Sequence, residues 1–223
     1  DRDGAVTLHI PEEHFFPWSP DSPFLYDLTV GTTQGEEEQR DTVHSYFALR
    51  KWSCAPDVHG IMRFCLNGKP ILLNGLLDQG YWPEGLYTPP SDGAVVRELQ
   101  TIKELGFNLL RKHAKIEPQR WYYHCDKLGL IVWQDMVNGG GPYKLWFVTY
   151  LTNVFQPLLR RLPDARPLWG LLGRETEAGR EEYARELEAT VKTLQCHPCV
   201  GCWVPFNEGW GQFDAAGAVE ACL

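Results

Sequence analysis

Apolar and polar positions follow two different rhythms along the 223 residues of the chain. In the first part, β-branched and aromatic runs are separated by Pro, Ser, Asp and Gly, a pattern typical of strands. These runs are residues 5–10, 24–30 and 42–52. The polar, acidic insert at 31–41 is predicted to be a hairpin tip in solvent. No helical period interrupts the strands, which favours part of a β-sandwich, with residues 54–60 as the linker that leaves it.

After residue 60 apolar strands alternate with amphipathic helices. The predicted strands are 70–80, 107–113, 130–135 and 199–206. Near-continuous apolar strands that alternate with helices predict a parallel sheet covered by helices, either doubly wound or part of a (β/α)8 barrel. Between the third and fourth strands, residues 138–173 have no clean period and are predicted to be a long excursion with short helices.

Three helices are predicted from apolar positions that recur every three or four residues. Their inner faces are Val95, Leu99, Ile102 and Leu105, then Trp121, Cys125 and Leu128, then Tyr183, Leu187, Val191 and Leu194. Ser91 or Asp92 can cap the first helix, and Gly106 ends it. Pro118 is suited to begin the second helix because the first turn does not need its N–H, and Gly129 ends that helix.

Polar side chains gather where the apolar strands stop. The strand ends carry Asp78, Gln79, Tyr81 and Trp82, then Arg111 and His113, then Trp133, Gln134 and Asp135, then Asn207, Glu208 and Trp210. The opposite ends carry few such residues. Each strand end alone could simply mark where a strand reaches water. Together they favour a site on one rim, since barrel enzymes place their chemistry at the C-terminal ends of the strands.

Charge and composition narrow the possible partners. The formal net charge is −8, and no Lys/Arg run exceeds two residues, which argues against a nucleic-acid partner. No uncharged apolar stretch is long enough to predict a membrane span. Neither a compartment nor an oligomeric state can be predicted from the sequence.

The seven cysteines include a C-x2-C-x2-C run at Cys196, Cys199 and Cys202. This run resembles part of a metal or iron–sulfur set, so a redox or metal module is one alternative. Successive strand residues point to opposite faces, however, so Cys199 and Cys202, three residues apart, are expected to diverge. We therefore expect no bound metal and no cofactor.

The residue types on the predicted rim suit carbohydrate. Carboxylates, amides and Arg bind sugar hydroxyls, while Trp and Tyr stack on the apolar faces of sugar rings. Glycoside cleavage needs two carboxyl groups, one of them protonated near neutral pH. Glu208 is the candidate acid, because a strand end walled by Trp203, Phe206 and Trp210 would favour the protonated form by excluding water. Trp82, Trp146 and Trp210 are candidate sugar platforms, whereas Trp18, Trp52 and Trp169 are expected in the core or at interfaces.

Four stretches in a fixed order resemble glycoside hydrolase family 2, the β-galactosidase and β-glucuronidase family. They are WSPDSPFLYDL with FALRKW, then NGKPILLNG, then ELGFNLLRKH with WYYHCDKLGLIVWQD, and finally HPCVGCWVPFNEGWG. The resemblance implies an α/β fold with a partial (β/α)8 TIM barrel of about four strands, preceded by part of an immunoglobulin-like β-sandwich. Residues 1–56 would form the partial sandwich and residues 57–223 the N-terminal half of the barrel.

The resemblance also implies a function, a retaining exo-β-glycosidase that hydrolyses O-glycosidic bonds. Glu208 would be the general acid/base. The resemblance assigns Asn207 and Arg111 to substrate binding, and the strand ends add His113, Asp78, Asp135, Trp210 and Trp82 as candidate substrate-binding residues, with His113 included because it shares a strand face with Arg111. Asn207 would bond the sugar hydroxyl beside the scissile bond, and Arg111 would orient the catalytic carboxylates.

The sequence departs from the family pattern in three places. The family's Arg-x-Ser-His is Arg111-Lys112-His113-Ala114 here, with the His one residue early, and the family's Asp-Glu falls on Gln134-Asp135. No Glu-Phe-Gly or Glu-Tyr-Gly that could supply the second, nucleophilic Glu occurs in the chain. We therefore expect a fragment that is inactive alone. The alternative is a non-catalytic carbohydrate-binding or scaffold protein with the same fold.

Overall fold

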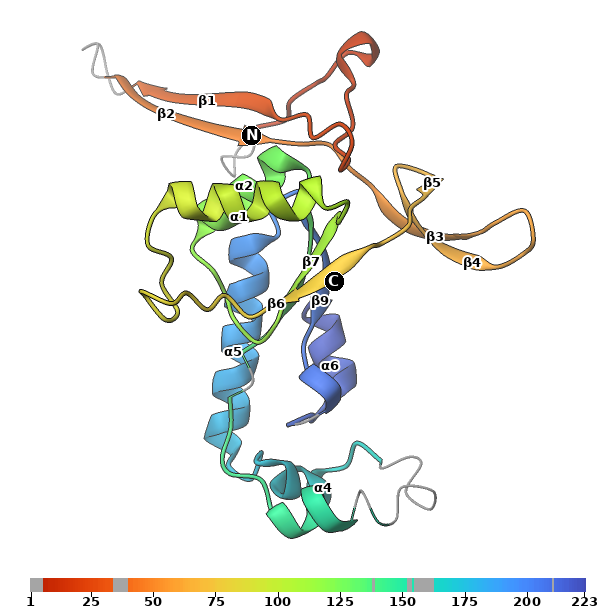
Figure 1. Cartoon of the computed structure of the whole chain (residues 1–223), viewed down its shortest axis with the longest axis vertical. Coiled ribbons are helices and arrows are strands. Elements are labelled where there is room, and N and C mark those ends of the chain that lie inside the picture. Colours follow the sequence, from red (N-terminus) through yellow and green to blue (C-terminus); the bar gives the residue numbers. More distant parts are fainter. Residues whose placement is uncertain (1–5, 34–39, 138, 152–153, 155–162, 210) are drawn as a thin grey trace.

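The computed structural model describes residues 6–33, 40–137, 139–151, 154, 163–209 and 211–223, which form three small sheets and several helices (Figure 1). A short 3-10 helix, Glu12–His14, precedes the first strand. The three sheets are an antiparallel hairpin, a three-stranded sheet and a four-stranded parallel sheet.

The first sheet is the hairpin of β1 (Tyr26–Thr33) and β2 (Arg40–Phe47), which confirms the strand predicted at 24–30. The inner residues of its predicted tip lie outside the described residues. The strand predicted at 5–10 is wrong over residues 6–10, which have no regular structure. Val6 and Leu8 are exposed there, and no strand within the described residues pairs with this backbone to form a ladder.

The second sheet corrects the predicted linker at 54–60. β3 (Trp52–Pro56) and β4 (Met62–Leu66) form a hairpin across it, and β5 (Lys69–Pro70) adds a short edge. Asp57 closes the turn, because its Oδ1 accepts hydrogen bonds from the backbone N–H of His59 and Ile61. The predicted run 42–52 is likewise divided between β2 and β3.

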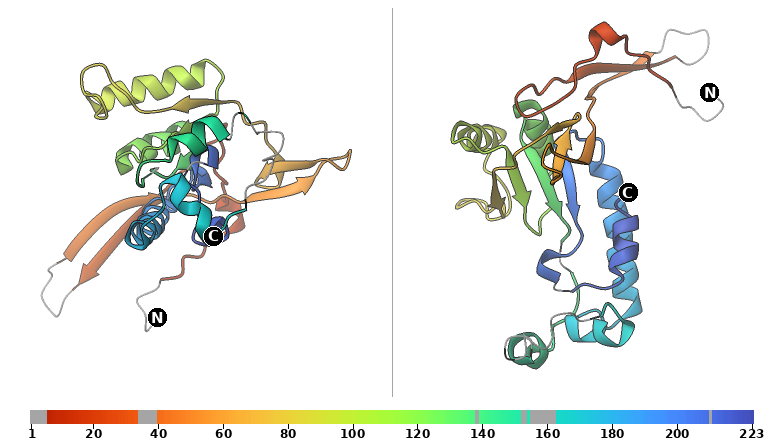
Figure 2. Two further views of the ribbon diagram at one scale, coloured as in Figure 1. Left: turned by 90° about the horizontal axis from the view of Figure 1, so that it is seen from below. Right: turned by 90° about the vertical axis from the view of Figure 1, so that its right-hand side faces the viewer.

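The third sheet carries the order β6 (Gly75–Asp78), β7 (Leu109–Lys112), β8 (Ile131–Asp135) and β9 (Val200–Val204), all parallel. Helices α1 (Asp92–Glu104), α2 (Gln119–Leu128) and α5 (Glu177–Leu194) connect the strands. The predicted alternation of strand and helix is confirmed. Figure 2 shows the strands lying side by side, and their C-terminal ends therefore share one rim.

The helix ends follow the predicted capping chemistry. Ser91 caps α1, with its Oγ accepting from the N–H of Ala94, and Pro118 precedes α2. Gly129 ends α2 in the left-handed conformation, with φ of 72°, where glycine avoids the strain of a Cβ. Leu105 does not belong to the buried face predicted for α1, because it lies at the C-cap and is 69% exposed.

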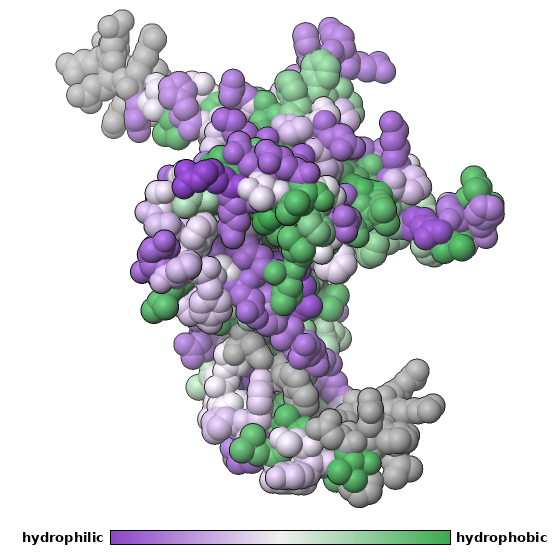
Figure 3. Space-filling view, in the orientation of Figure 1, coloured by the Kyte–Doolittle hydropathy of each residue, from purple (hydrophilic) through white to green (hydrophobic). Residues whose placement is uncertain are grey.

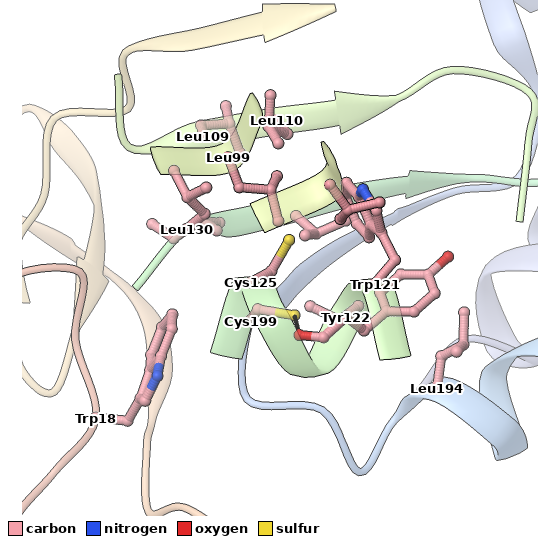
Figure 4. Close-up of a cluster of buried hydrophobic side chains, with 14 of the residues drawn as sticks. Trp18, Leu99, Leu109, Leu110, Trp121, Tyr122, Cys125, Leu130, Leu194 and Cys199 are labelled. Atoms are coloured by element: carbon pink, nitrogen blue, oxygen red, sulfur yellow. Dashed lines mark hydrogen bonds between the residues drawn. The ribbon is translucent and has the colours of Figure 1, made fainter. Parts of the chain in front are cut away.

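The main hydrophobic core lies between the helices and the parallel sheet (Figure 4). Its helix side chains include Leu99, Trp121 and Cys125, which pack with strand residues such as Leu110. Trp18 from the N-terminal segment is fully buried in the same cluster, and its Nε1 donates to Asp126 O at 2.8 Å. The expectation that Trp18 belongs to the core is confirmed, and this contact fixes the N-terminal segment against α2.

The excursion between β8 and α5 contains a π-helix (Trp146–Leu151), α4 (Arg166–Trp169) and a 3-10 turn (Gly170–Leu172). After β9 come a 3-10 turn (Asn207–Gly209) and α6 (Ala215–Glu220). A second hydrophobic cluster consists of Met136, Tyr183, Leu187 and Phe213, and Trp169 of α4 and Ala218 of α6 pack against it.

Apolar surface remains exposed beside the sheets. Figure 3 shows apolar surface over β6 and along the β3–β4 hairpin. The exposed apolar residues include Met62, Phe64, Leu72 and Leu77. Within the described residues, β6 and β9 are the edges of the parallel sheet. No helix among the described residues is both long and apolar enough to span a bilayer.

Candidate functional site

The C-terminal rim brings Arg111, Asp135 and Asn207 into one hydrogen-bonded group. Arg111 contacts Asp135 with two bonds, Nε to Oδ1 at 2.9 Å and Nη2 to Oδ2 at 3.0 Å. Its Nη2 also donates to Asn207 Oδ1 at 2.9 Å. These residues come from the ends of β7 and β8 and from the turn after β9, so three neighbouring connections meet here. A forked, charge-assisted arrangement of this kind fixes both position and orientation.

Strand geometry explains why these side chains meet. Arg111 pairs in register with Trp133, so Asp135, two residues further along β8, lies on the same face of the sheet as Arg111. Lys112 comes next on β7 and points to the opposite, helix-covered face, where its Nζ lies 4.3 Å from the centroid of the Trp121 ring. One strand therefore supplies two neighbouring cations to two different networks.

The Arg111–Asp135 pair is partly buried. The Asp135 side chain is fully buried, whereas that of Arg111 is 30% exposed. Hydrogen bonding to Asp135 raises the pKa of Arg111, while burial opposes this shift, and the negative charges of Asp135 and Glu208 add to it. The negative charge of Glu208 therefore acts on the Arg111 guanidinium. Arg111 remains a cation at any working pH of the protein.

Glu208 itself is exposed at the start of the turn that follows β9. Its backbone is left-handed, with φ of 53° and ψ of 17°, a conformation uncommon outside glycine. Of the three aromatic residues expected to wall it, two are described by the structure. Trp203 packs against the main core, and Phe206 packs in the second cluster. Trp210 lies outside the described residues.

Asp78 joins a different network from Arg111. Its Oδ2 accepts from Lys112 Nζ at 2.6 Å, and its Oδ1 accepts from the N–H of Gly80. Lys112 is 1% exposed and also donates to Glu117 Oε1 at 2.9 Å. A buried ammonium must be paired, so Asp78 is turned toward the helices. The expectation that Asp78 lies on one rim with Arg111 and Asp135 is not met by its side chain.

His113 and Trp82 lie on the loops beyond β7 and β6. His113 Nδ1 lies 3.1 Å from Gln79 Nε2, so these side chains link the two loops. Trp82 forms an isolated backbone bridge with Leu86 and packs against the main hydrophobic core. Its ring is therefore partly committed to packing. Trp146, the other candidate platform, is 57% exposed on the π-helix.

Sequence reasoning missed Lys112 and Glu117, which hold Asp78 in place, and the contacts that Arg174 makes to the turn after β9. The signal for Lys112 was available. A lysine inside an apolar parallel strand is expected to need a carboxylate partner. Arg174 falls in the segment without a clean period, where nothing in the pattern marks it.

All seven cysteines are free, and the C-x2-C-x2-C residues point to different partners. Cys196 Sγ contacts Thr193 O, whereas Cys199 Sγ contacts Tyr122 O in the core. Across the described ranges, no group of three or more His, Cys, Asp or Glu side chains is arranged to hold a metal ion. The cysteines thus act as buried or surface residues in this structure.

The chain is thus an α/β protein with a polar, carboxylate-bearing site at the C-terminal ends of its parallel strands. Known proteins with similar sequences and structures were also found. No family model matches the chain. A β-galactosidase from Leuconostoc mesenteroides is 28% identical over 156 residues, covering 68% of this chain and 14% of the relative. A β-galactosidase from Photobacterium profundum is 29% identical over 187 residues, covering 80% of this chain and 17% of the relative.

The solved structures agree. The β-D-glucuronidase of Dictyoglomus thermophilum superposes with a TM-score of 0.69 at 16% identity, over 93% of this chain and 32% of that one. The chain thus has the fold of part of these enzymes and spans about a sixth of the curated relatives it matches. The resemblance to glycoside hydrolase family 2 is confirmed, and the relatives are glycoside hydrolases.

Proposed function

We propose that the chain supplies the acid/base part of the active site of a retaining exo-β-glycosidase. The observation that carries this proposal is the network of Arg111, Asp135 and Asn207 beside Glu208. It gathers an anchored amide and a solvent-accessible carboxyl at the C-terminal ends of parallel strands. Sites on this rim are typical of barrel enzymes.

Asn207 is oriented for a sugar hydroxyl. Its Oδ1 accepts from Arg111 Nη2, and the bidentate pair with Asp135 prevents that guanidinium from turning. Because the carbonyl oxygen of the amide faces Arg111, its N–H groups are directed elsewhere and can donate. A hydroxyl next to the scissile bond is a suitable acceptor, and bonds of this kind strengthen in the transition state.

Glu208 would transfer the proton. In the first step its protonated carboxyl gives a proton to the glycosidic oxygen while the C–O bond breaks and its electron pair passes to that oxygen. A second carboxylate bonds the sugar carbon on the opposite face. In the second step the Glu208 carboxylate takes a proton from water, the water oxygen bonds the sugar carbon, and the bond from that carbon to the second carboxylate breaks, which releases the second carboxylate with its electron pair. No motif in this chain matches the second carboxylate, so we infer that it comes from elsewhere in the functional protein.

The domain assignment belongs to the same proposal. Residues 57–223 would form the N-terminal half of a (β/α)8 barrel, and residues 1–56 part of an immunoglobulin-like sandwich. Consecutive order of β6 to β9 supports the barrel, as does exposed apolar surface at the β6 edge, where Leu77 is 57% exposed. Such an edge is expected to be covered in a stable protein. The expected boundary at 56/57 falls in the turn of the β3–β4 hairpin.

The test is Glu208→Gln in the protein expressed with the sequence that flanks residues 1–223 in its gene. Aryl β-glycosides of galactose, glucuronic acid and glucosamine are assayed, each with a poor and a good leaving group. We expect kcat/KM to fall about 10²–10⁴-fold with the poor leaving group, since only that substrate needs the proton, and far less with the good one. Glu220→Gln, at the exposed end of α6, is the matched control and is expected to have no effect.

Unchanged hydrolysis of the poor substrate by Glu208→Gln would end this assignment. Binding of a sugar by the wild-type protein without any turnover would instead favour the carbohydrate-binding alternative.

A further inference from the structure

The turn that carries Glu208 is held from both sides by residues outside it. This turn is Pro205–Phe213, and among its described residues, which exclude Trp210, two are left-handed, Glu208 with φ of 53° and Gly211 with φ of 69°. Gly211 adopts this conformation without strain, but Glu208 does not. A strained backbone conformation at a functional residue persists only where the surrounding structure enforces it.

Two hydrogen bonds fix the ends of the turn. Before Glu208, the Tyr183 hydroxyl donates to Pro205 O. After Glu208, Arg174 Nε donates to Gly211 O at 2.8 Å. Both donors come from the same region of the chain, because Tyr183 lies on α5 and Arg174 lies just before that helix. Figure 1 shows α5 running beside β9 and α6, the two elements that the turn connects.

Aromatic packing joins the two anchors. The Tyr183 ring stacks on Phe206 with centroids 5.3 Å apart and meets Phe213 edge-on at 5.5 Å. The Arg174 guanidinium lies 4.5 Å from the centroid of the Tyr183 ring and 5.1 Å from that of Phe213. The Pro205 end of the turn therefore contacts Tyr183 through a hydrogen bond and a ring, whereas the Phe213 end contacts Tyr183 through a ring and Arg174 through a hydrogen bond and a cation–π contact.

Arg174 is not held by an ion pair. Its side chain is 3% exposed, its Nη2 is buried with no hydrogen-bond partner, and no carboxylate in the described part of the chain lies within 4.0 Å of it. A buried, unpaired guanidinium is unfavourable, and burial lowers the pKa of Arg174 accordingly. Residues that break a local rule in this way tend to serve a function.

We propose that Arg174 and Tyr183 are positioning residues that clamp the Pro205–Phe213 turn and so hold the Glu208 carboxyl in place for proton transfer. This inference rests on the proposed function of Glu208. Neither residue touches the reacting atoms. Both act through the backbone carbonyl groups of the turn, and loss of either would let Glu208 leave its left-handed conformation.

The experiment uses the same protein with its flanking sequence and compares Arg174→Met and Tyr183→Phe with Glu208→Gln. Met retains apolar contact with both rings but cannot donate, and Phe retains the ring stacking but lacks the hydroxyl. We expect kcat for poor leaving groups to fall about 10- to 100-fold, the loss typical of a displaced catalytic group. With good leaving groups we expect less than about a threefold change, since they need little proton donation.

Tyr46→Phe is the matched control. It removes a part-buried tyrosine hydroxyl bond, to Asp126 Oδ2 at 2.7 Å. The hydroxyl also lies 3.1 Å from Nδ1 of His197, which precedes β9, so this bond is at the opposite end of the strand from Glu208. It is expected to lower Tm without changing the leaving-group dependence.

Three outcomes separate the two proposals. A selective loss in both clamp variants and in Glu208→Gln supports the clamp. A selective loss in Glu208→Gln alone, or equal losses of the clamp variants on all substrates, overturns the clamp and leaves the function of Glu208 standing. No selective loss in Glu208→Gln overturns the proposed function and the clamp with it.

Discussion

Removal of the Arg111 side chain tests the site without any assay of activity. Arg111→Met would leave the Asp135 carboxylate, which is fully buried, without the two charge-assisted bonds it accepts from Nε and Nη2. Its other contact, from the N–H of Ala114 at 3.4 Å, is long. Breaking a buried pair by removing one partner typically lowers the free energy of unfolding by about 3–5 kcal/mol. For a chain of this size, that corresponds to a Tm lower by about 6–20 °C.

The assay is urea and thermal unfolding followed by tryptophan fluorescence. Arg63→Met is the control, because the Arg63–Asp57 bridge is exposed on the arginine side and should contribute about 1 kcal/mol or less. The double variant Arg111→Met/Asp135→Asn removes the stranded charge and should recover much of the loss. The reasoning fails if Arg111→Met unfolds at the same urea concentration as Arg63→Met, or if Asp135→Asn gives no recovery in the double variant.

Two further predictions concern buried groups away from the rim. Lys112→Met is expected to lower the free energy of unfolding by about 3–5 kcal/mol, because it leaves the buried side of Asp78 without its cation and leaves Glu117 paired with Lys115 alone. Arg120→Met, in an exposed pair, should change the free energy of unfolding by about 1 kcal/mol or less. Urea titration measures both effects, and equal effects would contradict the prediction. Burial raises the pKa of the Cys199 thiol well above its usual value. A raised pKa keeps the thiol protonated and therefore unreactive. Iodoacetamide is expected to leave Cys199 unmodified in the native protein from pH 7 to about pH 9 while it alkylates the exposed Cys54. Mass spectrometry would detect both modifications, and rapid modification of Cys199 in the native protein would refute the prediction.

The local pattern of the sequence was sufficient for most elements of the parallel sheet. Ser91 and Gly129 act through their own backbone and nearest neighbours, so their roles as caps could be predicted. The β3–β4 hairpin was missed because Asp57 closes a turn whose flanking strands do not stand out as a pair in the pattern. The predicted strand at 5–10 failed for the opposite reason, since a strand pattern forms no strand without a partner.

The sequence by itself determined which residues reach the ends of the parallel strands, because apolar runs and helical periods are local properties. Only the tertiary structure decided which of those residues meet. Arg111 joined Asp135 and Asn207, whereas Asp78 turned to the other face, because the buried Lys112 ammonium required a carboxylate there. Such choices depend on strand register and on the local dielectric environment, which arise only when distant segments pack together.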